Sequence, residues 1–255
     1  WLLNNVPTDK EILRKWLKCG FIFNGELFPT EEGTPQGGII SPTLANMALD
    51  GLQSLLEHCI RKYKKNYKTI VSKIHLVRYA DDFIVTAKDR ETIETVILPL
   101  VRNFMAERGL TLSEEKTKIT HISEGFDFLG FNIRKFPNNT LLTQPSDDAK
   151  KRFCDKIRKV IESNKTVKQR SLIKMLNPII MGWGNYYKYG TSAETFHRVD
   201  WEIHRKLWQW ARRRHSNKSK GWVKDKYFKT VNGRKWCFVA DMEERSKMRQ
   251  ISLAY

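Results

Sequence analysis

The stretch Ile74-His75-Leu76-Val77-Arg78-Tyr79-Ala80-Asp81-Asp82-Phe83-Ile84-Val85-Thr86-Ala87 sets the fold of this chain. One apolar run precedes the acidic pair Asp81-Asp82 and another follows it. Each run has the length of one strand and is rich in β-branched or aromatic residues. Because neighbouring strands with a two-residue connection form a hairpin, we predict an antiparallel hairpin with both carboxylates at or beside its turn.

The acidic pair at this turn has two interpretations. In the first, Asp81 and Asp82 only close the hairpin, since Asp is a common turn residue. In the second, they bind a divalent cation, because Mg²⁺ takes hard oxygen ligands and compensates the repulsion between adjacent carboxylates. The tetrapeptide Tyr79-Ala80-Asp81-Asp82 favours neither, and the motifs before and after it favour the second.

The positive charge of the chain is concentrated in its second part. The 255 residues carry a net charge of +18. Residues 1–150 hold 20 basic and 19 acidic side chains, whereas residues 151–255 hold 26 basic and 9 acidic ones. Such a field predicts a polyanionic partner, with nucleic acid as the first candidate. An anionic membrane surface is disfavoured, because the basic residues alternate with Trp and Tyr instead of facing one apolar stripe.

The composition and the first residues of the chain bear on the class of protein to which it belongs. No apolar run reaches the length of a bilayer span, so we expect no membrane protein. The chain opens without an initiator Met or a signal peptide, and we expect it to lack an N-terminal part. The cysteines are too scattered for a zinc site, which predicts reduced thiols; they are Cys19, Cys59, Cys154 and Cys237.

Up to Pro145, helical and strand patterns mix without a strict βαβ repeat, which predicts an α+β fold. Thr8 or Asp9 is the expected N-cap of the first helix, and Ser41 that of the second. The expected elements are a helix over 9–17 ended by Gly20, a hairpin over 21–28 around Asn24-Gly25, one helix from Ser41-Pro42 through Leu56, a basic loop over 61–68, a helix over 91–108 capped by Asp89 and kinked at Pro99, a strand after Lys118, and a hairpin over 125–133.

Beyond Pro145 the pattern is helical. Three helices, over 147–163, 167–189 and 193–214, predict a small bundle, and a hairpin around Asn232-Gly233 follows. His197, Asp200 and His204 share one face of the third helix. A metal site is open there, but polar surface is the favoured interpretation.

Several motifs in order carry a resemblance to a known family. The chain resembles a reverse transcriptase of the group II intron type, and its basic tail resembles the maturase region, or thumb, of that family. The resemblance covers nearly the whole chain. The motifs are Gly33-Thr34-Pro35-Gln36-Gly37-Gly38, Ile40-Ser41-Pro42-Thr43-Leu44-Ala45-Asn46, Arg78-Tyr79-Ala80-Asp81-Asp82, Leu112-Ser113-Glu114-Glu115-Lys116-Thr117 and Phe128-Leu129-Gly130-Phe131, with Trp183-Gly184-Asn185-Tyr186-Tyr187 and Leu207–His215 in the tail.

The resemblance implies a right-hand polymerase architecture. Residues 1–144 would form the palm, with an antiparallel sheet and flanking helices. Residues 145–230 would form an all-helical thumb, the maturase domain X, and residues 231–255 a hairpin and the start of a linker toward a C-terminal DNA-binding region. The fingers, a first catalytic strand with another metal-binding Asp, and an endonuclease region are expected outside this sequence. We expect polymerase activity to need that upstream Asp.

The chemistry implied by the resemblance is nucleotidyl transfer with two Mg²⁺ ions and deoxynucleoside triphosphates. Asp81 would be the main metal ligand and Asp82 a weaker one. Lys116 would protonate the leaving group, and a plain surface lysine is an equal alternative. The nucleotide and primer would be bordered by Pro35, Gln36, Gly37, Tyr79, Ala80, Phe128, Leu129 and Gly130.

The implied partners are group II intron RNA, target DNA, and an RNA template with a DNA primer, in the bacterial cytoplasm or an organelle. A homodimer stays open, and no membrane partner is expected. The alternative function is a polymerase-inactive maturase that only binds RNA; a defence-associated reverse transcriptase is disfavoured by the tail. Replacement of Arg212, Arg213 and Arg214 together is expected to leave folding intact. The expected phosphate contacts are Lys188, Arg212, Arg213, Arg214, Lys218 and Lys220.

Overall fold

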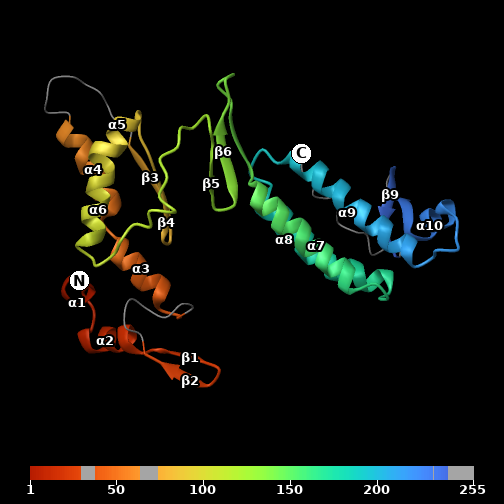
Figure 1. The fold of residues 1–255 in the computed structure, drawn as a ribbon, viewed down its shortest axis with the longest axis horizontal. Helices are drawn as coiled ribbons and strands as arrows, with labels where there is room; N and C mark the ends of the chain where they lie inside the picture. Colours follow the sequence, from red (N-terminus) through yellow and green to blue (C-terminus); the bar gives the residue numbers. More distant parts are fainter. Residues whose placement is uncertain (30–37, 64–73, 232, 241–255) are drawn as a thin grey trace. The chain divides into compact units, whose positions relative to one another are not determined.

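The computed structural model describes residues 1–29, 38–63, 74–231 and 233–240 (Figure 1). The chain divides into two compact units, Trp1–Ile119 and Thr120–Tyr255. Both units combine helices with short antiparallel strands, which confirms a mixed α+β class. No helix among the described residues is both long and apolar enough to cross a membrane.

The first unit begins with two helices and a hairpin, as the sequence predicts. They are α1 (Leu2–Asn5), α2 (Lys10–Lys18), β1 (Phe21–Phe23) and β2 (Glu26–Phe28). Asp9 caps α2, because its carboxylate accepts hydrogen bonds from the backbone N of Glu11 and of Ile12, both at 2.9 Å. Asn24 and Gly25 have φ values of 52° and 86°, the left-handed pair that joins two strands tightly.

The sequence predicts one continuous helix from Ser41 through Leu56. The structure has two helices there, so that prediction is wrong. These helices are α3 (Ser41–Leu49) and α4 (Leu52–Tyr63). Asp50 is extended, with ψ 144°, and Gly51 has φ 87°, which ends one helix before the next begins. Ser41 is the first helical residue, and Ile40 is the N-cap without a side-chain bond. Arg61 lies inside α4 instead of a loop, and residues 64–68 lie outside the described residues.

The acidic hairpin and a broken helix complete the first unit. They are β3 (His75–Tyr79), β4 (Asp82–Thr86), α5 (Arg90–Thr92), the π-helical turn η1 (Ile93–Ile97) and α6 (Leu98–Ala106). The Asp89 carboxylate accepts from Thr92 N at 2.8 Å, which confirms the predicted cap. The irregular turn ends just before Pro99, which has no N–H to continue the ladder. α4, α6 and η1 share one apolar core with Ile74.

The strand predicted after Lys118 is absent from this part of the chain, which the structure describes in full. Residues 110–121 form a loop with a turn in which Thr117 N donates to Ser113 O at 2.9 Å. Among the described strands, β5 lies at the edge of its sheet and pairs only with β6.

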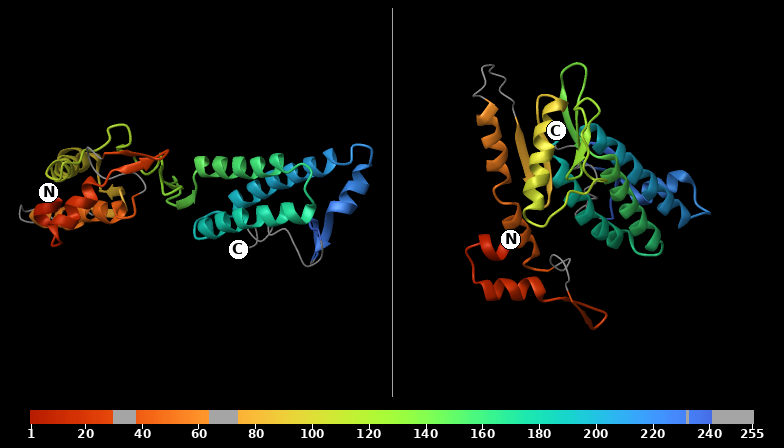
Figure 2. Two further views of the ribbon diagram at one scale, coloured as in Figure 1. Left: turned by 90° about the horizontal axis from the view of Figure 1, so that it is seen from below. Right: turned by 60° about the vertical axis from the view of Figure 1, so that its left-hand side comes forward.

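The second unit holds a three-stranded antiparallel sheet and three long helices. These elements are β5 (Phe126–Phe128), β6 (Phe131–Lys135), β7 (Leu141–Pro145), α7 (Asp147–Ser163), α8 (Gln169–Tyr187) and α9 (Ala193–Arg213). β7 was not predicted, and the helices lie within two residues of their predicted limits. Figure 2 shows α7, α8 and α9 running side by side. The sheet thus belongs to the same unit as the bundle, and the division at residue 144 stays a prediction.

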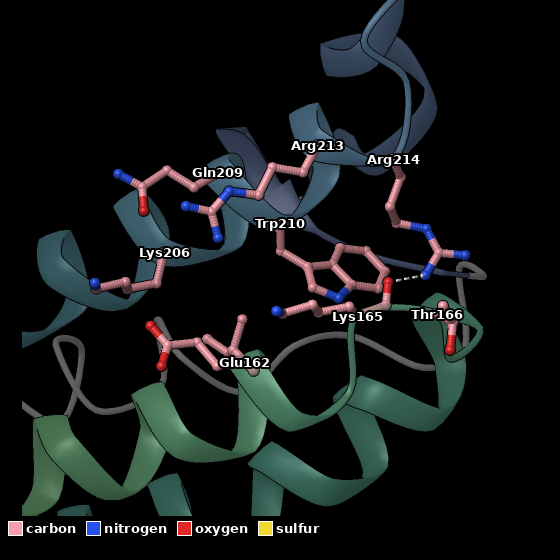
Figure 3. Close-up of a pocket in the computed structure, with 9 residues that line it drawn as sticks. Glu162, Lys165, Thr166, Lys206, Gln209, Trp210, Arg213 and Arg214 are labelled. Atoms are coloured by element: carbon pink, nitrogen blue, oxygen red, sulfur yellow. Dashed lines mark hydrogen bonds between the residues drawn. The ribbon is translucent and has the colours of Figure 1, made fainter.

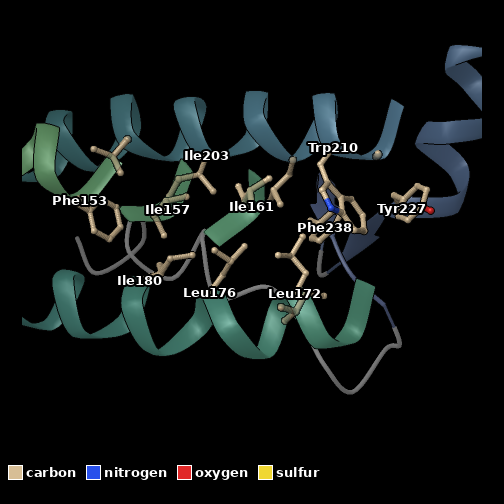
Figure 4. Packing of buried hydrophobic residues seen from close by; sticks show 14 of the residues in the cluster. Phe153, Ile157, Ile161, Leu172, Leu176, Ile180, Ile203, Trp210, Tyr227 and Phe238 are labelled. Carbon is tan, nitrogen blue, oxygen red and sulfur yellow. The ribbon is translucent and has the colours of Figure 1, made fainter. Parts of the chain in front are cut away.

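The bundle core is a continuous apolar layer between the three helices (Figure 4). α7 contributes Ile157 and α9 contributes Leu207, which are 1% and 0% exposed. At one end the core is closed by α10 (Lys220–Tyr227), which was not predicted, and by the predicted hairpin of β8 (Phe228–Val231) and β9 (Arg234–Phe238). Such burial along whole helices gives the basic residues of this unit a rigid support.

Candidate functional site

The acidic pair lies at the exposed tip of the β3–β4 hairpin. Tyr79 pairs with Asp82 across the hairpin, so Ala80 and Asp81 form its two-residue turn. Ala80 has φ 54°, which such a turn requires. Tyr79 is 66% exposed, and both carboxylates are exposed too. The predicted hairpin is confirmed, and its turn presents the side chains of Tyr79, Asp81 and Asp82 to solvent.

Arg78 ties this turn to α3. Its Nη1 donates to Asn46 Oδ1 at 2.8 Å and to the carbonyl oxygen of Ala80 at 3.1 Å. Asn46 closes the Ser41–Asn46 part of a separate sequence motif, so the structure brings two motifs together. The sequence offered one signal for this contact, an arginine directly before the acidic turn, but not its partner.

The donor set of this turn fits part of a magnesium site. Magnesium is commonly held by one or two carboxylates together with substrate phosphates and water. Asp81 and Asp82 supply two hard, exposed carboxylates, and no group of three or more metal-binding side chains occurs among the described residues.

His204 of α9 is not polar surface, since its ring packs at 5.1 Å from the Phe228 ring and 5.9 Å from the Trp236 ring.

Two other parts of the predicted nucleotide site are Lys116 and the segment of residues 35–37. Lys116 is exposed in the turn that follows Ser113, and its backbone N donates to Ser113 O at 3.2 Å. Its role in proton transfer stays a prediction. Pro35, Gln36 and Gly37 lie outside the described residues.

The Leu129-Gly130 turn, predicted to hold a primer, belongs to the second unit and is held by α8. Leu129 and Gly130 have φ values of 49° and 79° and join β5 to β6. Tyr186 Oη donates to Leu129 O at 2.8 Å, and Ser146 N donates to Gly130 O at 2.8 Å. Both carbonyls of the turn are therefore anchored on residues far along the chain.

The aromatic end of α8 packs directly on this turn. A side chain at Gly130 would meet Tyr187 Oη at 2.5 Å. The Phe131 ring lies 5.5 Å from the ring of Tyr186 and 4.8 Å from that of Tyr187. Burial raises the pKa of Tyr187, with a smaller contribution from Tyr186. The Trp183–Tyr187 motif thus supports the Phe128–Phe131 motif, a relation that sequence reasoning missed.

We predict that Tyr186→Phe loosens the Leu129-Gly130 turn and leaves the bundle folded. The lost hydrogen bond is worth about 1 kcal/mol, because the carbonyl can turn to water instead. Amide hydrogen exchange across β5 and β6 measures the effect. Tyr189→Phe is the matched control, since Tyr189 is 85% exposed. Unchanged exchange in Tyr186→Phe would show that this bond does not hold the turn.

The predicted phosphate-binding residues lie at helix ends of the second unit. Lys188 is the C-cap of α8, and Arg212 and Arg213 are in the last turn of α9. Lys218 and Lys220 flank the start of α10, and Lys218 Nζ lies 5.6 Å from the Trp222 ring. All of these side chains are exposed, as phosphate contacts require.

Arg214 differs from its neighbours. Its Nη1 donates to Lys165 O at 2.8 Å and to Val167 O at 2.7 Å. Its guanidinium lies 4.5 Å from the centre of the Trp210 ring. Its removal would also remove two hydrogen bonds to the α7–α8 loop, and the tolerance of folding to joint replacement of Arg212, Arg213 and Arg214 stays a prediction.

Comparison with known proteins assigns both parts of the chain. The family model described as reverse transcriptase (RNA-dependent DNA polymerase) matches residues 2–133. The model described as group II intron, maturase-specific domain matches residues 150–228. The acidic turn falls in the first match, and the second covers most of α7 and all of α8 and α9.

Individual relatives are similar but longer. An uncharacterized 91 kDa protein in the cob intron of Schizosaccharomyces pombe is 27% identical over 74% of this chain and 32% of its own length. The group II intron-encoded protein LtrA of Lactococcus lactis is 28% identical over 63% of this chain and 37% of its own length. The aligned part of the chain thus spans about a third of the length of these relatives.

Proposed function

Because this chain belongs to the reverse transcriptase family, in the group II intron-encoded branch with a maturase-specific domain, we propose that it is the polymerase and RNA-binding part of an intron ribonucleoprotein. Its first unit would extend a DNA primer on an RNA template. Its second unit would act as the thumb and bind intron RNA to assist splicing. Together they would serve target-primed reverse transcription at a DNA site.

The observation that carries the polymerase proposal is the pair of carboxylates at the exposed hairpin tip. Magnesium held there would help to ionise the primer 3′-hydroxyl and stabilise the leaving pyrophosphate. Asp81, in the turn itself, would be the main ligand, and Asp82, which begins β4 beside it, would be a weaker one. Arg78 keeps the turn in position through Asn46 and the Ala80 carbonyl.

The remaining residues would position nucleic acid. Tyr79 and Ala80 border the carboxylates, and the small side chain of Ala80 leaves room for the primer end and the incoming deoxynucleoside triphosphate. The Leu129-Gly130 turn, held by Tyr186 and Ser146, would contact the primer strand. Lys116 would donate a proton to the pyrophosphate.

A second candidate function is a maturase that binds RNA without polymerising. It is favoured by the limited ligand set, since the described residues supply only the adjacent pair of carboxylates at this tip. Primer extension and intron splicing, measured on one preparation of the full-length protein with Mg²⁺, separate the two functions. Extension of a DNA primer on RNA supports the polymerase; splicing without extension assigns the maturase alone.

We predict that Arg212→Ala with Arg213→Ala weakens RNA binding and flattens its salt dependence. Each lost phosphate contact lowers the log–log salt slope by roughly 0.7–0.9, so the double variant should lose about 1.5. Titration of intron RNA at several salt concentrations measures it. The matched control removes Arg198 and Arg205 from the same helix, where each is paired with a glutamate. An equal slope in both variants would move the RNA-binding surface elsewhere.

A further inference from the structure

A cavity of about 430 Å³ opens between the ends of α7 and α9 (Figure 3). Its floor is apolar, formed by Ile161 and Trp210, which are 4% and 3% exposed. One wall is a single face of α9, with Lys206, Gln209 and Arg213 at helical spacing. A pocket of this size accommodates a nucleotide-sized group, and the residues that line it come from one folded unit.

Trp210 of α9 and Arg214, the C-cap of that helix, line the cavity and bond the segment that follows α7. Trp210 Nε1 donates to Asn164 O at 2.9 Å. Arg214 donates to the carbonyl oxygens of Lys165 and Val167. These carbonyls follow the C-terminal end of α7, where a helix carries partial negative charge that disfavours an anion. These carbonyls already accept hydrogen bonds from Trp210 and Arg214, so they do not need a ligand as their donor.

The charge of the lining favours an anion with hydroxyl or amino groups attached. Lys165, Lys206 and Arg213 stand at the cavity, and for none of them is an ion pair with another described residue found. Glu162 faces them from α7 (Figure 3). Three cations suit a phosphodiester, whereas a carboxylate repels phosphate and accepts hydrogen bonds from ribose hydroxyls or base amino groups. A site that binds phosphate alone would gain nothing from the carboxylate of Glu162.

We propose that this cavity binds one unpaired ribonucleotide of a single-stranded RNA. Lys206 and Arg213 hold its phosphate, the base or sugar enters above Trp210, and Glu162 accepts from the 2′-hydroxyl. The 2′-hydroxyl is the group by which a protein tells RNA from DNA at one position, and bases of unpaired strands are free to leave the stack. The inference rests on the proposed RNA-binding function and adds a single-strand, ribose-specific site to it.

Filling the cavity tests this site without changing its charge. In the full-length protein, Thr166→Trp should weaken binding of a short unstructured RNA by about tenfold, the effect of losing one good polar contact. Binding of an RNA duplex of equal length, and the salt slope of that duplex binding, should not change. Thr140→Trp is the matched control, because Thr140 is exposed in the same unit and outside the cavity. Fluorescence anisotropy measures the affinity of each of these two variants for the single strand and for the duplex.

Glu162→Met tests the ribose contact independently of the filled variant. Under the proposal the preference for RNA over DNA of the same sequence falls by about tenfold. A merely electrostatic surface predicts the opposite pattern, in which both affinities rise together because a negative charge is lost. The proposed site is overturned if both affinities rise in Glu162→Met. It is also overturned if Thr166→Trp binds the single strand as tightly as Thr140→Trp does. A wild-type protein that binds no RNA would overturn the proposed function as well.

Discussion

Replacing Asp81 by Ala is expected to lower primer extension on an RNA template by on the order of a thousandfold or more, because a group that acts in the transition state is removed. RNA binding should persist, since the positive field lies in the second unit. Both quantities are measured on one preparation. Asp82→Ala should cost less, because Asp82 begins a strand beside the turn.

The matched control for this experiment is Glu124→Ala, which removes an exposed loop carboxylate that belongs to no group of three or more metal-binding side chains among the described residues. It should leave extension unchanged. Wild-type extension by Asp81→Ala would disprove the assignment of the acidic turn. Loss of RNA binding together with extension would instead point to a folding defect.

Gly190→Ala is expected to destabilise the second unit by about 1–3 kcal/mol, the usual cost of overpacking. An added Cβ would lie 2.6 Å from Thr143 O and 3.1 Å from the Phe131 ring. The backbone cannot yield easily there, because Thr191 N donates to the same Thr143 oxygen at 2.7 Å. Thermal unfolding should shift downward by several degrees, at about 4 °C for each kcal/mol.

A glycine in the adjacent helix provides a control of opposite sign. A Cβ at Gly182 would meet nothing within 4 Å, and Gly182 lies inside α8. Gly182→Ala should therefore stabilise the unit by about 0.5–1 kcal/mol, because alanine loses less backbone entropy in a helix. Equal shifts in the two variants would mean that the close contact at Gly190 is relieved by small movements.

Features encoded by neighbouring residues were predictable from the sequence. Asp9 and Asp89 cap helices because an aspartate bonds the free N–H groups just after it. Asn24-Gly25 and Ala80-Asp81 form two-residue turns between strands. The acidic hairpin and the helix over 147–163 follow from periodicity and local turn chemistry, which need no distant partner.

Only the tertiary structure decided what distant residues do for one another. Tyr186 bonds Leu129, 57 positions away, and Arg214 bonds Lys165, 49 positions away. The same guanidinium would suit a phosphate or a carbonyl oxygen, so its residue type cannot choose between binding RNA and holding a loop. Because Arg214 bonds the Lys165 carbonyl, it lines the cavity beside Trp210 as part of the fold. A side chain's chemistry is local information, whereas its partner depends on how the helices pack.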